Sequence, residues 1–261
     1  MLATDGDFNV GMTDFDQLIQ LVEKKRNKGV SLTTLGFGSG NYNDHLMEQL
    51  ADAGNGNHAY IDTLKEANKV LVEQMGATLQ TIAKDVKIQL EFNPAQVSQY
   101  RLIGYENRQL RNQDFNNDKI DAGEIGAGHT VTALYEIVLA DSEGGWIEPL
   151  KYQATKNNGS LSGELAELRI RYKQPDSDSS ELILQALNTK DIMQELDDSS
   201  ENFRFSAAVA GFGQVLRGGN MLQEFNYDEV LDLARSARGN DDHGYRGEFL
   251  TLVSLASSLE E

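Results

Sequence analysis

The stretch that decides the fold is Leu2-Ala3-Thr4-Asp5-Gly6-Asp7, close to the start of the chain. Its short apolar run ends in a Thr-Asp-Gly turn, and an amphipathic helix pattern follows from Asp14. In open α/β sheets, ligands bind at the carboxyl ends of the parallel strands. An exposed Asp at such an end can hold a hard cation, directly or through water. We therefore expect a parallel sheet with Asp5 at its ligand-binding edge.

Residues 1–82 alternate between strand patterns and helix patterns. Apolar residues 15, 18, 19 and 22 have helical spacing, and a basic run followed by Gly29 marks the end of that helix. Such alternation predicts right-handed parallel crossovers, and hence an α/β fold with a Rossmann-like parallel sheet. The expected strands are 2–4, 30–37 and 58–61, and the expected helices begin at Asp14, at Asn43 or Asp44, and at about Leu64, the last running to Ile82.

The pattern changes in the remainder of the chain. Residues 83–190 contain alternating, β-branched segments with Gly and Asn turns, which predict an antiparallel β-sandwich-like region. Residues 191–261 read as a C-terminal helical element of three helices, the first capped by Asp198 or Ser199. The expected strands of the β-rich domain are 86–92, 100–105, 130–139 and 165–172.

Three motifs carry a family resemblance: Leu2–Asp7, Thr34-Leu35-Gly36-Phe37-Gly38, and the segment from Asn43 to Gly56. Together they resemble the second half of a bacterial von Willebrand factor type A domain. The succession of this half-domain, a β-region and helices resembles bacterial proteins in which an uncharacterised domain follows a type A domain. The resemblance covers nearly the whole chain and implies a truncated type A domain at 1–82.

The type A family binds Mg²⁺ or a similar ion at a metal-ion-dependent adhesion site. Its ligands come from an Asp-x-Ser-x-Ser loop, a Thr in a middle loop, and the Asp of a Thr-Asp-Gly turn. Only the last is matched here, by Asp5, so the resemblance implies an incomplete metal site. The segment 176–180, Asp-Ser-Asp-Ser-Ser, lies downstream of that turn, and we interpret it as a linker.

The resemblance also implies a role. In the family, the ion keeps an open coordination position that a carboxylate of a protein partner completes. We therefore expect a non-enzymatic protein-protein interaction module, metal-dependent in the intact parent, in the bacterial cell envelope and outside the cytoplasm. A strand that normally lies inside the sheet becomes an edge in the half-domain, so we also expect self-association.

An alternative role rests on the Asp/Asn-rich loop 114–124. Oxygen-bearing side chains at its first, third and fifth positions resemble the start of a calcium loop. Lys119 replaces the Gly that the sharp turn needs, and Ile125 occupies the position of the bidentate Glu. The alternatives are an ordinary turn between two strands and a calcium-stabilised structural scaffold; the candidate Ca²⁺ ligands are Asp114, Asn116, Asp118, Asp121 and Glu124.

Composition excludes several classes of function. The formal net charge of -18 over 261 residues argues against nucleic acid as a partner. The chain has no Cys, which removes thiolate chemistry and disulfides, and no apolar run approaches the length of a transmembrane helix. The four histidines show no helical metal-ligand spacing, and we assign His45 and His58 to packing or surface roles. No nucleophile can be named together with a base, so we expect no enzyme activity.

Overall fold

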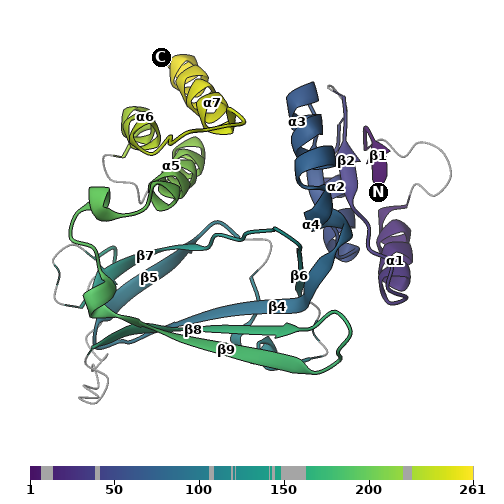
Figure 1. The fold of residues 1–261 in the computed structure, drawn as a ribbon, viewed down its shortest axis with the longest axis horizontal. Coiled ribbons are helices and arrows are strands. Elements are labelled where there is room, and N and C mark those ends of the chain that lie inside the picture. Colours follow the sequence, from purple (N-terminus) through teal and green to yellow (C-terminus); the bar gives the residue numbers. More distant parts are fainter. Residues whose placement is uncertain are drawn as a thin grey trace. The chain divides into compact units, whose positions relative to one another are not determined.

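The computed structural model describes residues 1–6, 14–38, 42–105, 109–118, 120, 122–140, 142, 145–147, 163–219 and 225–260 (Figure 1). The chain divides into two compact units. The first comprises Met1–Gln89, Leu110–Thr130 and Arg169–Ile183, and the second comprises Leu90–Gln109, Val131–Leu168 and Leu184–Glu261.

The first unit contains the expected parallel sheet. Strands β1 (Leu2–Thr4), β2 (Thr34–Gly36) and β3 (His58–Tyr60) lie in the order β1-β2-β3, and both pairs are parallel. Strand β2 is shorter than the predicted 30–37. Leu32 donates its N–H to the carbonyl of Gly54 (2.9 Å), so this part of the chain bonds to the end of a helix before the strand ladder begins.

Helices connect these strands, as the sequence predicts. Helix α1 (Phe15–Arg26) is capped by Asp14, and helix α2 (Asp44–Ala53) is capped by Asn43, each through a side-chain oxygen that accepts a backbone N–H. The single long helix expected over 64–82 is wrong. Its place is taken by α3 (Leu64–Asn68), a π-helical turn η1 (Lys69–Glu73) and α4 (Met75–Leu79), because extended chain that pairs with another strand already begins at Thr81.

The two faces of the parallel sheet bury different side chains. Leu35 and Ile61 form a buried cluster with Val70 of η1 on one face. On the other face, Thr34 is fully buried and its hydroxyl donates to the carbonyl of Met47 in α2 (3.0 Å). Met47 is itself 0% exposed. Helical segments therefore cover both faces, which is the three-layer arrangement that an α/β fold requires.

The antiparallel strands belong to two sheets. One has the order β6-β4-β8-β9, and the other consists of β5 and β7. Their bounds are β4 (Thr81–Phe92), β5 (Val97–Ile103), β6 (Gly123–Gly126), β7 (Leu134–Leu139), β8 (Glu164–Lys173) and β9 (Ser180–Asn188). In the β5–β7 pair, Arg101 lies opposite Glu136 and their side chains form an ion pair of 2.5 Å, which fixes the register.

One local prediction needs correction. The segment 176–180 is not a linker, because it turns the chain from β8 into the neighbouring strand β9 of the same sheet. The loop 114–124 begins with a 3₁₀ turn, η3 (Asn112–Asp114), and leads into β6.

The C-terminal part is helical, as predicted. After the 3₁₀ turns η5 (Thr189–Asp191) and η6 (Leu196–Asp198), it contains α5 (Glu201–Leu216), α6 (Tyr227–Ser236) and α7 (Tyr245–Glu260). The cap of α5 is Ser200, not Asp198 or Ser199, because its hydroxyl accepts the N–H of Phe203 (3.2 Å). These helices share a core; its buried members are Tyr227, Val230, Leu231 and Val253. Among the described residues, no helix is both long enough and apolar enough to cross a bilayer.

Candidate functional site

The carboxyl ends of the parallel strands form one edge of the first unit. Backbone hydrogen bonds continue to the last residue of each strand, with Phe37 N–H donating to Thr4 O (3.1 Å) and Ile61 N–H donating to Gly36 O (2.8 Å). Because the strands are parallel, the residues that follow them lie at the same edge of the sheet. We call this the carboxyl edge, and Asp5 is its acidic residue.

The turn after β1 holds Asp5 at the surface. The Thr4 hydroxyl donates to Asp5 Oδ1 (3.3 Å) and accepts the N–H of Gly6 (3.2 Å). Gly6 has φ +78°, and a Cβ added there would lie 3.1 Å from the backbone nitrogen of Asn43, the cap of α2. Glycine is therefore required by both the backbone conformation and the close approach of the helix. The Asp5 side chain is left exposed at the carboxyl edge.

Aromatic side chains border Asp5. Phe37 and Tyr60 are 37% and 38% exposed. Tyr60 Oη donates to the carbonyl of Gly38 (2.6 Å), and a Cβ at Gly38 would lie 3.9 Å from Asp5 Cβ. The Tyr42 ring packs on Tyr60 with 4.9 Å between centroids. The sequence patterns gave these aromatics no functional role, although Phe37 and Tyr60 lie at the ends of the expected strands 30–37 and 58–61, where side chains reach the edge of the sheet.

The carboxyl edge supplies only part of the ligand set that a hard cation needs. Mg²⁺ prefers six oxygen ligands and keeps several of them as water, so one carboxylate supplies part of a site. Across the ranges that the structure describes, no group of three or more His, Cys, Asp or Glu side chains is gathered closely enough to hold a metal ion. Asp5 can therefore serve as one ligand, and further protein ligands would have to come from other residues.

The side chains of the predicted calcium loop contact different partners and do not converge on one point. Asp114 is buried and accepts a bond from Arg111 Nε (2.7 Å). Glu124 accepts a bond from the amide of Asn55 (3.3 Å). Asn116 is exposed, and Asp121 lies outside the described residues.

Asp118 of this loop takes part in an ion-pair network with the β8–β9 hairpin. Arg171 donates to both its carboxylate oxygens (3.0 and 3.1 Å), and the Ser180 hydroxyl donates to Oδ1 (2.5 Å). These bonds, first from Ser180 and then from Arg171, lower the pKa of Asp118. Lys173 pairs with Asp85 (2.5 Å), and this hydrogen bond raises the pKa of Lys173. Asp114 and Asp118 thus face arginine side chains, and the calcium site stays a prediction.

A second cluster in the first unit surrounds His58. Its ring nitrogens face Thr34, Asp44 and Tyr42, which come from β2, α2 and the residue before the α2 cap. Sequence spacing gave no sign of this cluster, because its members lie at positions 34, 42, 44 and 58 and meet only through the parallel crossover.

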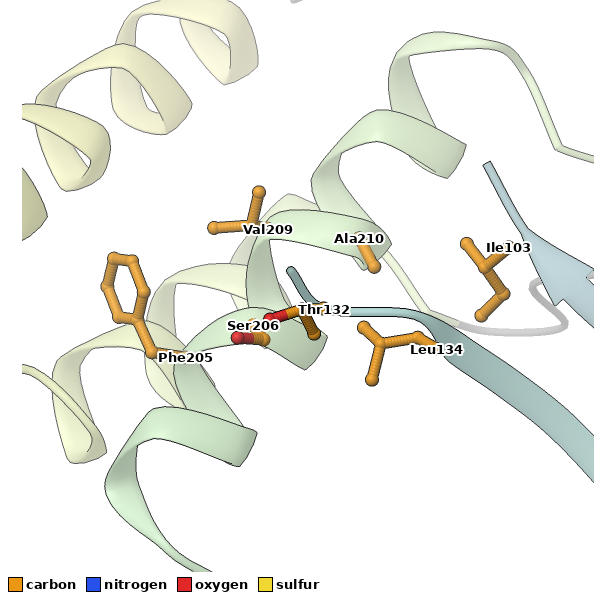
Figure 2. Close-up of a pocket in the computed structure, with 7 residues that line it drawn as sticks. All are labelled: Ile103, Thr132, Leu134, Phe205, Ser206, Val209 and Ala210. Carbon is orange, nitrogen blue, oxygen red and sulfur yellow. The ribbon is translucent and has the colours of Figure 1, made fainter. Parts of the chain in front are cut away.

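The second unit contains an apolar pocket of about 270 Å³ (Figure 2). Figure 2 shows side chains of α5 opposite Ile103 at the end of β5 and Leu134 at the start of β7. The other lining residues are Thr132, Phe205, Ser206, Val209 and Ala210. The lining contains no titratable side chain, so the pocket offers no group for acid-base chemistry or metal binding.

Comparison with known proteins places the chain in a family. A family model described as "Uncharacterized protein YfbK, C-terminal" matches residues 77–259. The chain belongs to this family. The match begins within α4 and takes in the antiparallel strands and the three C-terminal helices as far as residue 259, and the parallel sheet precedes it.

A relative and a solved structure add to this comparison. "Uncharacterized protein YfbK" of Escherichia coli (strain K12) is 46% identical over 263 residues, which include 100% of this chain and 45% of the relative. The chain thus spans less than half the length of that relative. The crystal structure of the ArnB paralog VWA2 from Sulfolobus acidocaldarius aligns over 86% of this chain and 51% of its own, at 17% identity and a TM-score of 0.33. A score this low carries no argument about fold or function.

Proposed function

We propose that this member of the YfbK C-terminal family is a non-enzymatic protein-protein interaction module whose binding surface is the carboxyl edge. In this proposal, the three-stranded sheet is the second half of a type A domain. Asp5 contributes one ligand to a Mg²⁺ site that is complete only in the intact parent. The bound ion would supply an open coordination position for a carboxylate of the partner.

The observation that carries the proposal is the position of Asp5. It is exposed at the ligand-binding edge of a parallel sheet, on a turn whose glycine is fixed by its contact with the cap of α2. Half-exposed Phe37 and Tyr60 beside it provide the aromatic surface that is enriched in protein interfaces. The net charge of -18 favours cations over anions as ligands of the chain as a whole.

A Mg²⁺ titration tests the metal part of the proposal. Thermal unfolding of the longer parent is followed in EDTA and in increasing MgCl₂, with the wild-type sequence, with Asp5→Asn and with Asp16→Asn, because the proposed site is complete only in the parent. Asp16 is an exposed acid on α1, so its variant removes the same charge at another place. We expect Mg²⁺ to raise the unfolding midpoint of the wild type and of Asp16→Asn, because the native state alone binds the ion. An equal response of Asp5→Asn would contradict a role for Asp5.

Two further parts of the proposal concern assembly and location. Strand β1 has one neighbour, β2, among the described strands, so its other edge offers backbone groups to a second copy. We infer that the chain self-associates. Light scattering tests this inference, and a monodisperse monomer would refute it. We also propose an extracytoplasmic place in the bacterial cell envelope, from the resemblance to envelope proteins, and cell fractionation tests it.

A further inference from the structure

Strand β9 forms a long edge of its antiparallel sheet. In the order β6-β4-β8-β9, its one neighbour among the described strands is β8, so the backbone groups along its other side face no described strand (Figure 1). The strand has nine residues, against three in β1, and an edge of this length is a template for a further strand. Natural edges are often blocked by lysine or proline, and residues 180–188 contain neither.

The side chains of β9 are exposed on both faces of the sheet. All residues from 181 to 186 are exposed, and Leu182, Ile183 and Leu184 keep 49%, 48% and 55% of their surface in solvent. Successive side chains point to opposite faces, so Leu182 and Leu184 lie on one face and Ile183 on the other. Three consecutive exposed apolar residues are a fault in a strand unless they serve a contact. A strand added at this edge would cover apolar side chains on both faces.

The charge pattern within β9 favours a second, antiparallel copy of the same strand. Glu181 is the one charged residue of β9 and lies near its beginning. In a parallel copy, the two Glu181 carboxylates would lie side by side and repel each other. In an antiparallel copy centred on Leu184, each Glu181 lies opposite Leu187. The two carboxylates are then about 20 Å apart, at about 3.4 Å per residue along the strands.

The charges that flank β9 favour the same direction. Exposed Asp176 and Asp178 precede the strand, whereas the charges of exposed Lys190 and Asp191 cancel each other beyond its end. An antiparallel copy therefore brings the acidic end of one strand to the neutral end of the other. A parallel copy would bring the two acidic ends together.

We propose that β9 pairs with β9 of a second copy of this chain, antiparallel and across a two-fold axis. Two four-stranded sheets join at this edge, and each copy contributes the same surface, as a two-fold contact requires. The pairing bonds the outer backbone edge of β9 and covers Leu182, Ile183 and Leu184. It uses neither the carboxyl edge nor β1, so it is independent of the function and of the β1 contact proposed above.

Disulfide cross-linking tests which residues of the two copies meet. The chain has no Cys, so one introduced Cys reports on one position. Opposite residues of an antiparallel pair have Cα atoms about 4.5–5.5 Å apart, a separation that a disulfide spans. Under mild oxidation, Leu184→Cys should form linked dimers at least about tenfold faster than Glu181→Cys. Leu252→Cys on α7, a position 54% exposed, is the control for random collision. Equal rates at positions 184 and 252, or faster linking at 181, would overturn the proposal.

Sedimentation velocity with charged variants separates pairing from folding. Leu184→Lys and Leu184→Glu should each weaken the dimer at least about tenfold, because like charges then meet across the axis. An equimolar mixture of the two variants should restore dimers, since unlike charges meet. Ala3→Lys blocks the edge of β1 and should dimerise like the wild type.

Circular dichroism verifies that each variant is folded. A monomeric wild type, or no recovery of dimers in the mixture, would overturn the proposal. Dimers lost in Ala3→Lys and kept in Leu184→Lys would also overturn it, because self-association would then belong to β1.

Discussion

Replacing Gly6 with Ala should destabilise the turn that carries Asp5, and Gly29 provides an internal control. Both glycines have left-handed backbones, with φ of +78° and +80°. A Cβ at Gly29 would meet nothing within 4 Å, whereas at Gly6 it would lie 3.1 Å from Asn43 N and 3.4 Å from Asn43 O. The two variants therefore share the backbone penalty and differ in the contact with the cap of α2.

The expected magnitudes follow from this difference. An L-residue in the left-handed region costs about 1–2 kcal/mol, and the reduced entropy of the unfolded chain returns about 0.4–1 kcal/mol. Gly29→Ala should thus lower the free energy of unfolding by about 1 kcal/mol. Overpacking against a helix backbone adds about 1–3 kcal/mol, so Gly6→Ala should cost about 2–4 kcal/mol in total.

Hydrogen exchange of the α2 amides, measured in both variants and in the wild type, gives the local opening free energies directly. Gly6→Ala should reduce protection at the start of α2, because Asn43 must move to admit the methyl group. Gly29→Ala should leave α2 protection close to that of the wild type. Equal losses of protection in the two variants would refute the close approach of the turn to the helix cap.

Three further predictions concern charged and titratable groups. Ultraviolet titration of the tyrosines should show Tyr42 ionising at about pH 12; because this pKa is raised from 10.0 in the folded state, its stabilising contribution is present below pH 10 and lost as pH rises through 12. If the Tyr42→Phe variant has one fewer tyrosine that ionises near pH 12, the assignment to Tyr42 is confirmed. Asp241→Asn should lower the unfolding free energy by about 1 kcal/mol, because its carboxylate accepts the N–H groups of Arg246 (2.9 Å) and Gly247 (2.8 Å) in the first turn of α7. Burial raises the pKa of Asp241, but these two bonds and the Arg238 side chain together lower it below its usual value. The wild type should therefore lose this stabilisation as pH falls through the lowered pKa, and an equal loss of stability in acid for Asp241→Asn would contradict the assignment. Asp118→Asn should lower the thermal midpoint in EDTA as well as in CaCl₂, because its partners are Arg171 and Ser180; a loss seen only with Ca²⁺ would support the calcium loop instead.

Much of the fold was predictable because it depends on local patterns. Asp14 and Asn43 have the side chains that cap helices, and each stands directly before an amphipathic run. Strand β3 and the three C-terminal helices were found in the same way. The long helix over 64–82 was wrong because the pairing of Thr81 with Gly126 of β6 ends it, and that partner lies far away in the sequence.

The candidate site residues were predictable where their motif is contiguous in the sequence, and not where they meet only in the fold. Asp5 was predictable because its motif is contiguous and its location follows from the direction of one strand. The cluster around His58 was not, because each of its four members alone reads as an ordinary core or surface residue. Likewise, the partners of Asp118 lie on β8 and at the start of β9, and no spacing within loop 114–124 indicates them.

Site-specific photo-crosslinking tests the central claim that the carboxyl edge binds a protein partner. A photoreactive phenylalanine analogue replaces Phe37, which is 37% exposed at the carboxyl edge, or Val30, which is 56% exposed before the amino end of β2 and serves as the control. We expect crosslinked protein from position 37 in cells that make the chain within its longer parent, loss of that product in Asp5→Asn, and no such product from position 30. Crosslinking from position 37 that is unchanged in Asp5→Asn, or equal from both positions, would contradict the claim.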